Sequence, residues 1–316
     1  PDSSEPWSLS SCSGGNMDFS ENGEYIVSIY DTCGAYETPG IWMDHSKFEL
    51  FHKDNSTPLR SYTVEESSIR EIHISDDGQY IATGSRFLGG GTYEGIVHLF
   101  HKDDSIPLWN YTLRGNVHSM SISADGQYIA VGTMKDYECD HSRPYDEEDN
   151  ICMPYVYLFH KNSSEPLWVY TVQHSGWVIS IDISADGEYI AAGTLYIGDS
   201  DSGGGGGKLH FFHKDSNGPL WITKEDYSLQ VNDLTLSADG GKLVGSAKGY
   251  NVLTWNTTNG EIIGLYDGRD DYWPDDYTRS DISSDGQYML TADDEIIYLY
   301  EKDIEYGFDL LWQYHF

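Results

Sequence analysis

The chain has 316 residues, and its 18 lysines and arginines stand against 52 aspartates and glutamates, which gives a formal net charge of −34. A surface this negative repels phosphate backbones and anionic lipids, and the basic residues are scattered singly rather than gathered in a stripe. No stretch approaches the roughly 18 to 20 apolar residues of a membrane helix. We therefore expect no nucleic-acid partner and no membrane segment in this chain.

Six copies of one short motif follow one another along the sequence. They read FSENGEYIVSIY (19–30), ISDDGQYIATGS (74–85), ISADGQYIAVGT (122–133), ISADGEYIAAGT (183–194), LSADGGKLVGSA (236–247) and ISSDGQYMLTAD (282–293). Their shared glycines are Gly23, Gly78, Gly126, Gly187, Gly240 and Gly286, at spacings of 55, 48, 61, 53 and 46 residues. No gap is long enough to hide a seventh copy, so the sequence predicts six repeats.

Each copy predicts four short strands. An alternating strand such as 178–183 is followed by an Asp-Gly hairpin turn and by an apolar strand such as 189–193. Third strands are expected at 47–54, 96–103, 156–162, 209–215, 251–258 and 296–303. Fourth strands are expected at 58–63, 107–112, 166–171, 219–224 and 310–315, most of them headed by a proline that suits an edge strand.

Four-stranded sheets repeated at this period predict an all-β, six-bladed β-propeller with four antiparallel strands per blade in one domain, residues 1–316. The motif of strand, S-x-D-G turn, apolar strand and a third strand ending in an aromatic residue resembles the WD repeat. The fourth strand PLWxYT resembles the tryptophan-bearing end of PQQ-like propeller repeats. The resemblance implies the architecture only, because propellers carry many unrelated functions. A seven-bladed or strand-exchanged propeller is the alternative.

Residues 1–10 contain one more segment that reads like a fourth strand, since DSSEPWSLS matches NSSEPLWVY at 162–170. Six blades do not need it. We expect either an extra strand within one chain or a strand that pairs with a neighbouring copy by strand addition.

Long connections that differ between repeats are expected between the second and third strands, and such loops commonly carry function on a repeated scaffold. The four cysteines, Cys12, Cys33, Cys139 and Cys152, fall on or beside these connections. Their positions predict the disulfides Cys12–Cys33 and Cys139–Cys152 and therefore an oxidising compartment. Glycosylation sequons at Asn55, Asn110, Asn162 and Asn256 favour the same extracellular or cell-surface location.

Two kinds of acidic connection are candidate binding sites. Asp146, Glu147, Glu148 and Asp149 form one acidic run, while Asp199 and Asp201 precede glycines 203–207. Their oxygens on a flexible backbone would suit calcium, and a solvated loop is the alternative. Asp270, Asp271, Tyr272 and Trp273 combine acids with aromatic rings, which could stack on a sugar or clamp a basic peptide, with ordinary loop packing as the alternative.

The remaining polar repeats are expected to be structural. Histidines 52, 101, 160 and 213 recur in FHK and are expected to cap a turn in each repeat, and the aspartates at 77, 125, 186, 239 and 285 belong to the hairpin turns. No catalytic motif was found. The leading hypothesis is a secreted or cell-surface binding or structural module with a protein, glycan or self partner. The alternative is an extracellular hydrolase or metal-dependent lactonase-like enzyme with its site at the central channel, where Asn116, Trp177 and Asn232 differ between blades.

Overall fold

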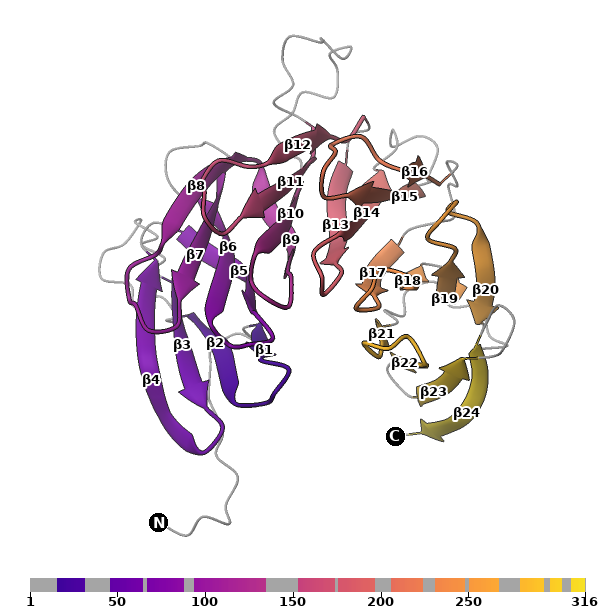
Figure 1. Ribbon diagram of the computed structural model, residues 1–316, viewed down its shortest axis with the longest axis horizontal. Coiled ribbons are helices and arrows are strands. Elements are labelled where there is room, and N and C mark those ends of the chain that lie inside the picture. Colours follow the sequence, from indigo (N-terminus) through magenta and orange to yellow (C-terminus); the bar gives the residue numbers. More distant parts are fainter. Residues whose placement is uncertain are drawn as a thin grey trace, which may run out of the picture. The chain divides into compact units, whose positions relative to one another are not determined.

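A computed structural model describes residues 16–31, 46–64, 67–87, 94–134, 153–173, 176–196, 206–223, 231–247, 250–266, 279–292, 296–302 and 308–315. All regular structure in these residues is β, in 24 strands, and strands paired within a repeat run antiparallel (Figure 1). The chain divides into two compact units, residues Pro1–Val117 and His118–Phe316. Each unit is described by itself.

The first unit contains two four-stranded sheets. The first has the order β1-β2-β3-β4 and the second β5-β6-β7-β8. Their bounds are β1 Met17–Phe19, β2 Tyr25–Asp31, β3 Ser46–His52, β4 Asn55–Val64, β5 Ser67–Ile74, β6 Tyr80–Phe87, β7 Glu94–His101 and β8 Trp109–Arg114. The start of β9 (Asn116–Ile122) ends this unit.

The second unit contains the remaining repeats. Strands β9 to β16 form one eight-stranded sheet, because Met134 of β10 pairs with Trp177 of β13 and thereby joins two repeats. The sheets β17-β18-β19-β20 and β21-β22-β23-β24 follow. The bounds are β10 Tyr128–Met134, β11 Tyr155–His160, β12 Trp168–Thr171, β13 Gly176–Ile183, β14 Tyr189–Tyr196, β15 Gly206–His213, β16 Trp221–Ile222, β17 Val231–Leu236, β18 Leu243–Ala247, β19 Tyr250–Trp255, β20 Ile262–Tyr266, β21 Arg279–Ile282, β22 Tyr288–Ala292, β23 Ile296–Lys302 and β24 Phe308–His315.

The Asp-Gly hairpins form as the sequence predicts. In the second repeat Asp77 Oδ1 accepts hydrogen bonds from Ser75 Oγ at 2.6 Å and from the Gln79 backbone N–H at 2.9 Å. Gly78 has φ +69°, a conformation that glycine adopts without steric cost. The corresponding aspartates 125, 186, 239 and 285 accept the same serine hydroxyl bond, so these acids are turn residues.

Successive sheets bury their apolar cores between them. In the first unit Val27, Phe48 and Leu50 of the first sheet cluster with Ile72 and Ile81 of the second. In the second unit Trp255 of β19 packs with Ala191 and Phe211 of the preceding repeat. This face-to-face packing of four-stranded antiparallel sheets is propeller packing.

The main departure from the predicted strands concerns their ends. Each of the first four third strands ends at the FHK histidine, two residues before the predicted end, because that histidine begins a turn. Prolines 107, 166 and 219 lie just before their edge strands. The third and fourth repeats share one sheet, so six separate blades are not observed as six separate sheets.

Candidate interaction surface

Carboxylates on the first strand of several repeats are used to hold the next sheet. Asp18 Oδ2 accepts the Ile74 N–H at 3.0 Å in the first unit. In the second unit Asp182 Oδ2 accepts the Leu236 N–H at 2.7 Å, and Asp233 Oδ2 accepts the Ser280 N–H at 3.2 Å. Burial raises the pKa of Asp233 despite these bonds. These acids therefore serve the scaffold.

His73 on β5 lies between two acids of the first unit. Its Nδ1 is 3.5 Å from Asp18 Oδ2 and its Nε2 is 3.7 Å from Glu71 Oε2. Burial works against the charged imidazole, but the two neighbouring carboxylates outweigh it and raise the pKa of His73 to about 10. The positive His73 thus links β1 to β5.

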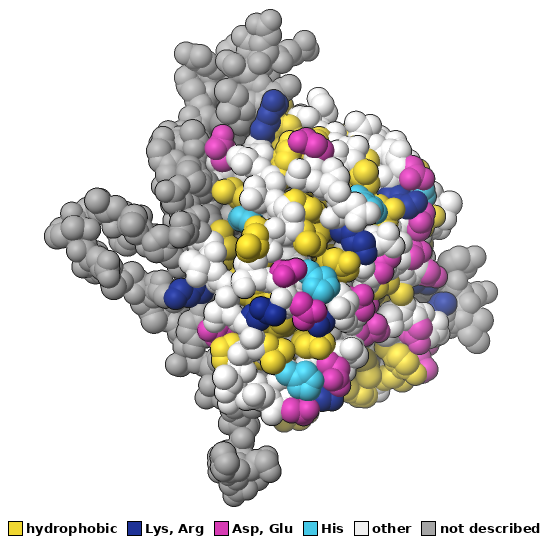
Figure 2. All heavy atoms as spheres, turned by 60° about the vertical axis from the view of Figure 1, so that its left-hand side comes forward, with side chains coloured by type: hydrophobic (Ala, Val, Ile, Leu, Met, Phe, Trp, Pro, Cys, Tyr) yellow, Lys and Arg dark blue, Asp and Glu magenta, His cyan; other side chains and the backbone are white. Residues whose placement is uncertain are grey.

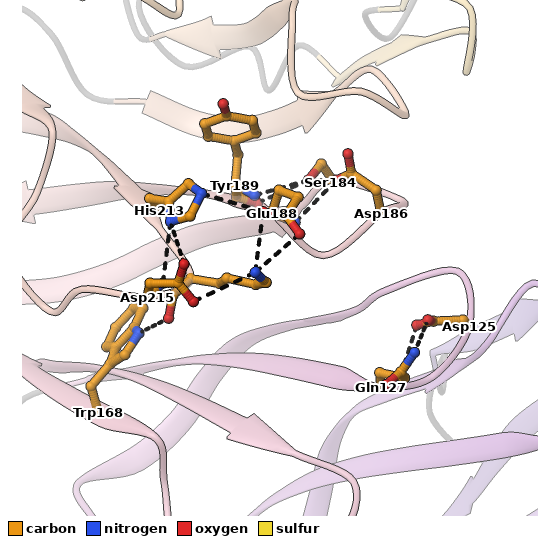
Figure 3. A network of polar contacts seen from close by, with 10 residues as sticks. Asp125, Gln127, Trp168, Ser184, Asp186, Glu188, Tyr189, His213 and Asp215 are labelled. Carbon is orange, nitrogen blue, oxygen red and sulfur yellow. Dashed lines mark hydrogen bonds and ion pairs between the residues drawn. The ribbon is translucent and has the colours of Figure 1, made fainter.

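The FHK histidines cap turns, as the sequence predicts. His213 Nδ1 accepts the Asp215 N–H at 3.3 Å (Figure 3). The same bond at the same distance recurs at His52, His101 and His160. His213 Nε2 is also 3.3 Å from Glu188, whose other oxygen is 3.0 Å from Lys214 Nζ. The hydrogen bond to Glu188 raises the pKa of Lys214. One end of the sheets carries the turns that join the first strand to the second and the third strand to the fourth. A repeated structural network therefore occupies this end.

Indole and phenol groups on the edge strands fasten neighbouring sheets. Trp168 Nε1 donates to the Lys214 carbonyl at 2.7 Å, and Trp221 Nε1 donates to the Thr257 carbonyl at the same distance. In the first unit Tyr62 Oη donates to the Lys102 carbonyl at 3.1 Å. These contacts were not predicted, although the recurring PLW motif was the signal for two of them.

The opposite end of the sheets carries the connections that differ between repeats. Described second strands end at residues 31, 87, 134, 196, 247 and 292, and the third strands resume at 46, 94, 155, 206, 250 and 296. Most predicted site residues lie in these gaps and outside the described residues: the calcium candidates Asp146, Glu147, Glu148, Asp149, Asp199 and Asp201, and Cys33, Cys139 and Cys152. Cys12 and the whole 1–10 segment, and Asp270, Asp271, Tyr272 and Trp273, are likewise outside them.

The four sequons lie in described structure. Asn55 begins β4, Asn110 lies in β8 and Asn162 lies in a turn, all with exposed side chains. Asn256 follows β19, is half-buried and accepts the Thr258 N–H at 2.8 Å. Three of the four asparagines are thus accessible.

The positions predicted for a channel-mouth enzyme site start the first strands of their repeats. Asn116 opens β9 and is buried in the first unit. Trp177 on β13 stacks on His118 with ring centroids 5.9 Å apart, and Asn232 lies on β17 in the same unit. Among the residues that the structure describes, no three His, Cys, Asp or Glu side chains form a group that could hold a metal ion.

Single leucines are exposed on an edge strand or directly before one. Leu59, Leu108, Leu167 and Leu220 are each about half exposed, at 51%, 48%, 51% and 55%. Figure 2 turns the β4 and β8 side of the first unit toward the reader and shows apolar side chains lying between acidic, basic and imidazole groups. No described helix is long and apolar enough to cross a membrane.

The fold is that of a β-propeller, and comparison with known proteins agrees with it. The family model "WD domain, G-beta repeat" matches residues 56–110 and 164–202. The chain therefore resembles WD-repeat β-propeller proteins. A search of curated proteins found no match.

Solved structures show the same architecture. One of them is the β-propeller domain of Cps50 (Swd1) from Myceliophteria thermophila, with a TM-score of 0.62 and 13% sequence identity. The match covers 95% of this chain and 85% of that one. At this identity the likeness shows the fold alone.

Proposed function

We propose that the protein is a binding and structural module built on a six-bladed β-propeller, which offers the variable connections of its repeats to a protein or glycan partner. The carrying observation is the contrast between the two ends of the sheets. One end is filled by the repeated serine–aspartate and histidine–glutamate–lysine contacts, while connections at the other end range from 2 to 20 residues between strands. The WD-repeat match supports the proposal, because such propellers commonly mediate protein interactions.

We also propose that six blades close the ring of the propeller. Tyr288 and Trp312 of the last sheet are 42% and 47% exposed. In the preceding repeats of the second unit, Tyr128 and Tyr189 pack against the turn glycine of a following sheet, and Trp168 and Trp221 donate to its turn carbonyl. We infer that another sheet of the closed six-bladed ring covers this face of the last sheet.

The location, the disulfides and self-assembly belong to the same proposal. An extracellular or cell-surface protein would form Cys12–Cys33 and Cys139–Cys152 and carry glycans at its exposed asparagines. Peptide mapping without reduction identifies these pairs, and four free thiols would reject them. Light scattering of the chain with and without residues 1–10 tests strand addition, since loss of an assembly on truncation is the expected result.

The binding function is tested by exchanging one connection. Residues 135–152 are replaced by a glycine–serine segment of equal length, and binding to glycan and surface-protein microarrays is compared with that of the wild type. Lys214→Ala is the matched control, because it alters only the structural turn end. We expect array signals that disappear in the exchanged chain and persist in the control. Signals that are unchanged by the exchange would place binding elsewhere.

A further inference from the structure

The second residue of the Asp-Gly hairpin turns differs between the two units. In the turns of the second unit this residue is small, as Ala124, Ala185, Ala238 and Ser284. The backbones of these turns meet there. The Ala124 N–H donates to the Ala185 carbonyl at 3.1 Å, and the Ala238 N–H donates to the Ser284 carbonyl at 2.9 Å. A small side chain therefore occupies the place where one turn lies against the turn of the next sheet.

In the first unit the same position carries two carboxyl groups. It is Glu21 in the turn between β1 and β2, and Asp76 in the turn between β5 and β6. The two side chains are hydrogen-bonded to each other, with Glu21 exposed and Asp76 half-buried. Two ionised carboxylates cannot form this bond, because each is an acceptor only. The bond therefore requires a proton on one of the two acids.

The charged groups that act on Asp76 come from both sheets. Burial, the charge and hydrogen bond of Glu21, and the charges of Asp18 on β1 and Asp77 in the same turn raise the pKa of Asp76 to about 6. The cation of this cluster is His73, whose Nδ1 lies 3.5 Å from Asp18 Oδ2. Asp76 is therefore the acid that retains the proton, and Glu21 accepts the hydrogen bond.

We propose that Glu21 and Asp76 form an acid-stabilised latch between the first two sheets. In mildly acidic solution protonated Asp76 donates a hydrogen bond to the Glu21 carboxylate and holds the two turns together. When the proton passes to solvent at neutral pH, the two carboxylates repel each other and the turns loosen. The sheets stay joined, because charged His73 still lies between Asp18 and Glu71.

The sign of the pH effect follows from the direction of the shift. When the turns open, Asp76 returns to its ordinary pKa of 3.8, so between that value and about 6 the closed turns hold the proton more tightly than the open ones. The stability of the closed turns therefore falls as the pH rises. If the whole shift is realised, the opening equilibrium changes by about tenfold between pH 5 and 7.5. Solvent screening of the half-exposed carboxyl group reduces this to a several-fold change.

Carbon-13 NMR of the intact chain, labelled at its aspartate carboxyl carbons, tests the latch. The Asp76 signal is the one missing from Asp76→Asn, and it should titrate near pH 6 in the wild type. Glu21→Gln removes the charge beside Asp76 and should lower its pKa by about one unit or more. Glu94→Gln is the matched control, because Glu94 is an exposed glutamate of the same unit, at the start of β7. It should leave the titration of Asp76 unchanged.

Hydrogen exchange followed by mass spectrometry measures whether the turns loosen. After correction for the chemical exchange rate, protection of residues 17–31 should fall several-fold from pH 5 to 7.5 in the wild type. It should stay constant in Asp76→Ala, which introduces the residue found in three turns of the second unit. Circular dichroism checks that this variant folds, and the titration of Glu21→Gln decides the matter if it does not.

Three results would overturn the proposal. The first is an Asp76 that titrates near its ordinary value in the wild type. The second is a pKa that Glu21→Gln leaves unchanged or that Glu94→Gln lowers equally. The third is a fall in protection with pH that is the same in folded Asp76→Ala as in the wild type.

Discussion

Replacing Trp168 by phenylalanine isolates one of the bonds that join successive sheets. The phenyl ring can keep the contact with Phe212, but the N–H that donates to the Lys214 carbonyl at 2.7 Å is lost. A typical intramolecular hydrogen bond contributes about 1 kcal/mol, and an acceptor left without its donor adds to the loss. We expect the free energy of unfolding to fall by about 1–2 kcal/mol.

Urea denaturation followed by far-UV circular dichroism measures this change, because the fluorescence of a tryptophan variant is not comparable with that of the wild type. The midpoint should fall at unchanged slope. Trp221→Phe removes the equivalent bond to Thr257 and should cost the same. If both variants lie within about 0.5 kcal/mol of the wild type, which is the range of ordinary surface substitutions, the indole bonds do not hold the sheets.

Trp312→Phe extends the experiment to the last sheet. Trp312 is 47% exposed, so an uncovered side chain predicts a change below about 0.5 kcal/mol. In the proposed six-bladed propeller another sheet of the closed ring covers Trp312, and the cost of Trp312→Phe should equal that of Trp168→Phe. A negligible effect beside a clear effect at Trp168 would reject completion of the propeller.

Two further predictions concern turn glycines and half-buried histidines. Gly187→Ala should lower the free energy of unfolding by more than the roughly 1–2 kcal/mol of placing a non-glycine residue in a left-handed conformation, because its new Cβ would lie 2.5 Å from Tyr128. The Cβ of Gly23→Ala would meet nothing within 4 Å, so this variant should lose only that smaller amount, and thermal melts compare the two. By imidazole NMR, His73 should stay protonated up to about pH 9, since its pKa is raised to about 10. Its contribution to stability is complete below the pKa of an unfolded histidine, about 6.5, and should be lost as the pH rises through 10. His98, whose pKa burial lowers to about 4, should stay neutral, and stability should fall as the pH falls from about 6.5 toward 4; the reverse order of titration would contradict both assignments.

The local structure of each repeat could be predicted from the sequence because it is set by neighbouring residues. The Asp77 turn needs only a serine two residues before it and a glycine after it. The histidine caps are equally local, since His213 bonds the backbone two residues further on. Such contacts recur wherever the motif recurs, and a single sequence therefore reveals them.

Contacts between repeats could not be predicted in the same way. Asp18 and His73 are 55 residues apart and meet only because two sheets stack, so the sequence showed a turn-forming repeat and no charged link. The connections between strands were expected to carry function for the opposite reason, namely that nothing in the repeat determines them. The candidate cysteines and acids in them lie outside the described residues and remain predictions.

One register position on the edge strands shows how far a repeat determines its contacts with the next sheet. Trp168 and Trp221 hold it in the third and fourth repeats, and their indoles donate to the backbone of the following sheet. The first repeat has Arg60 at this position and the fifth has Gly264. The fifth repeat stays joined to the last sheet because the Tyr266 hydroxyl accepts the Phe308 N–H, so the contact between these two sheets is carried by a residue two positions further along the same strand.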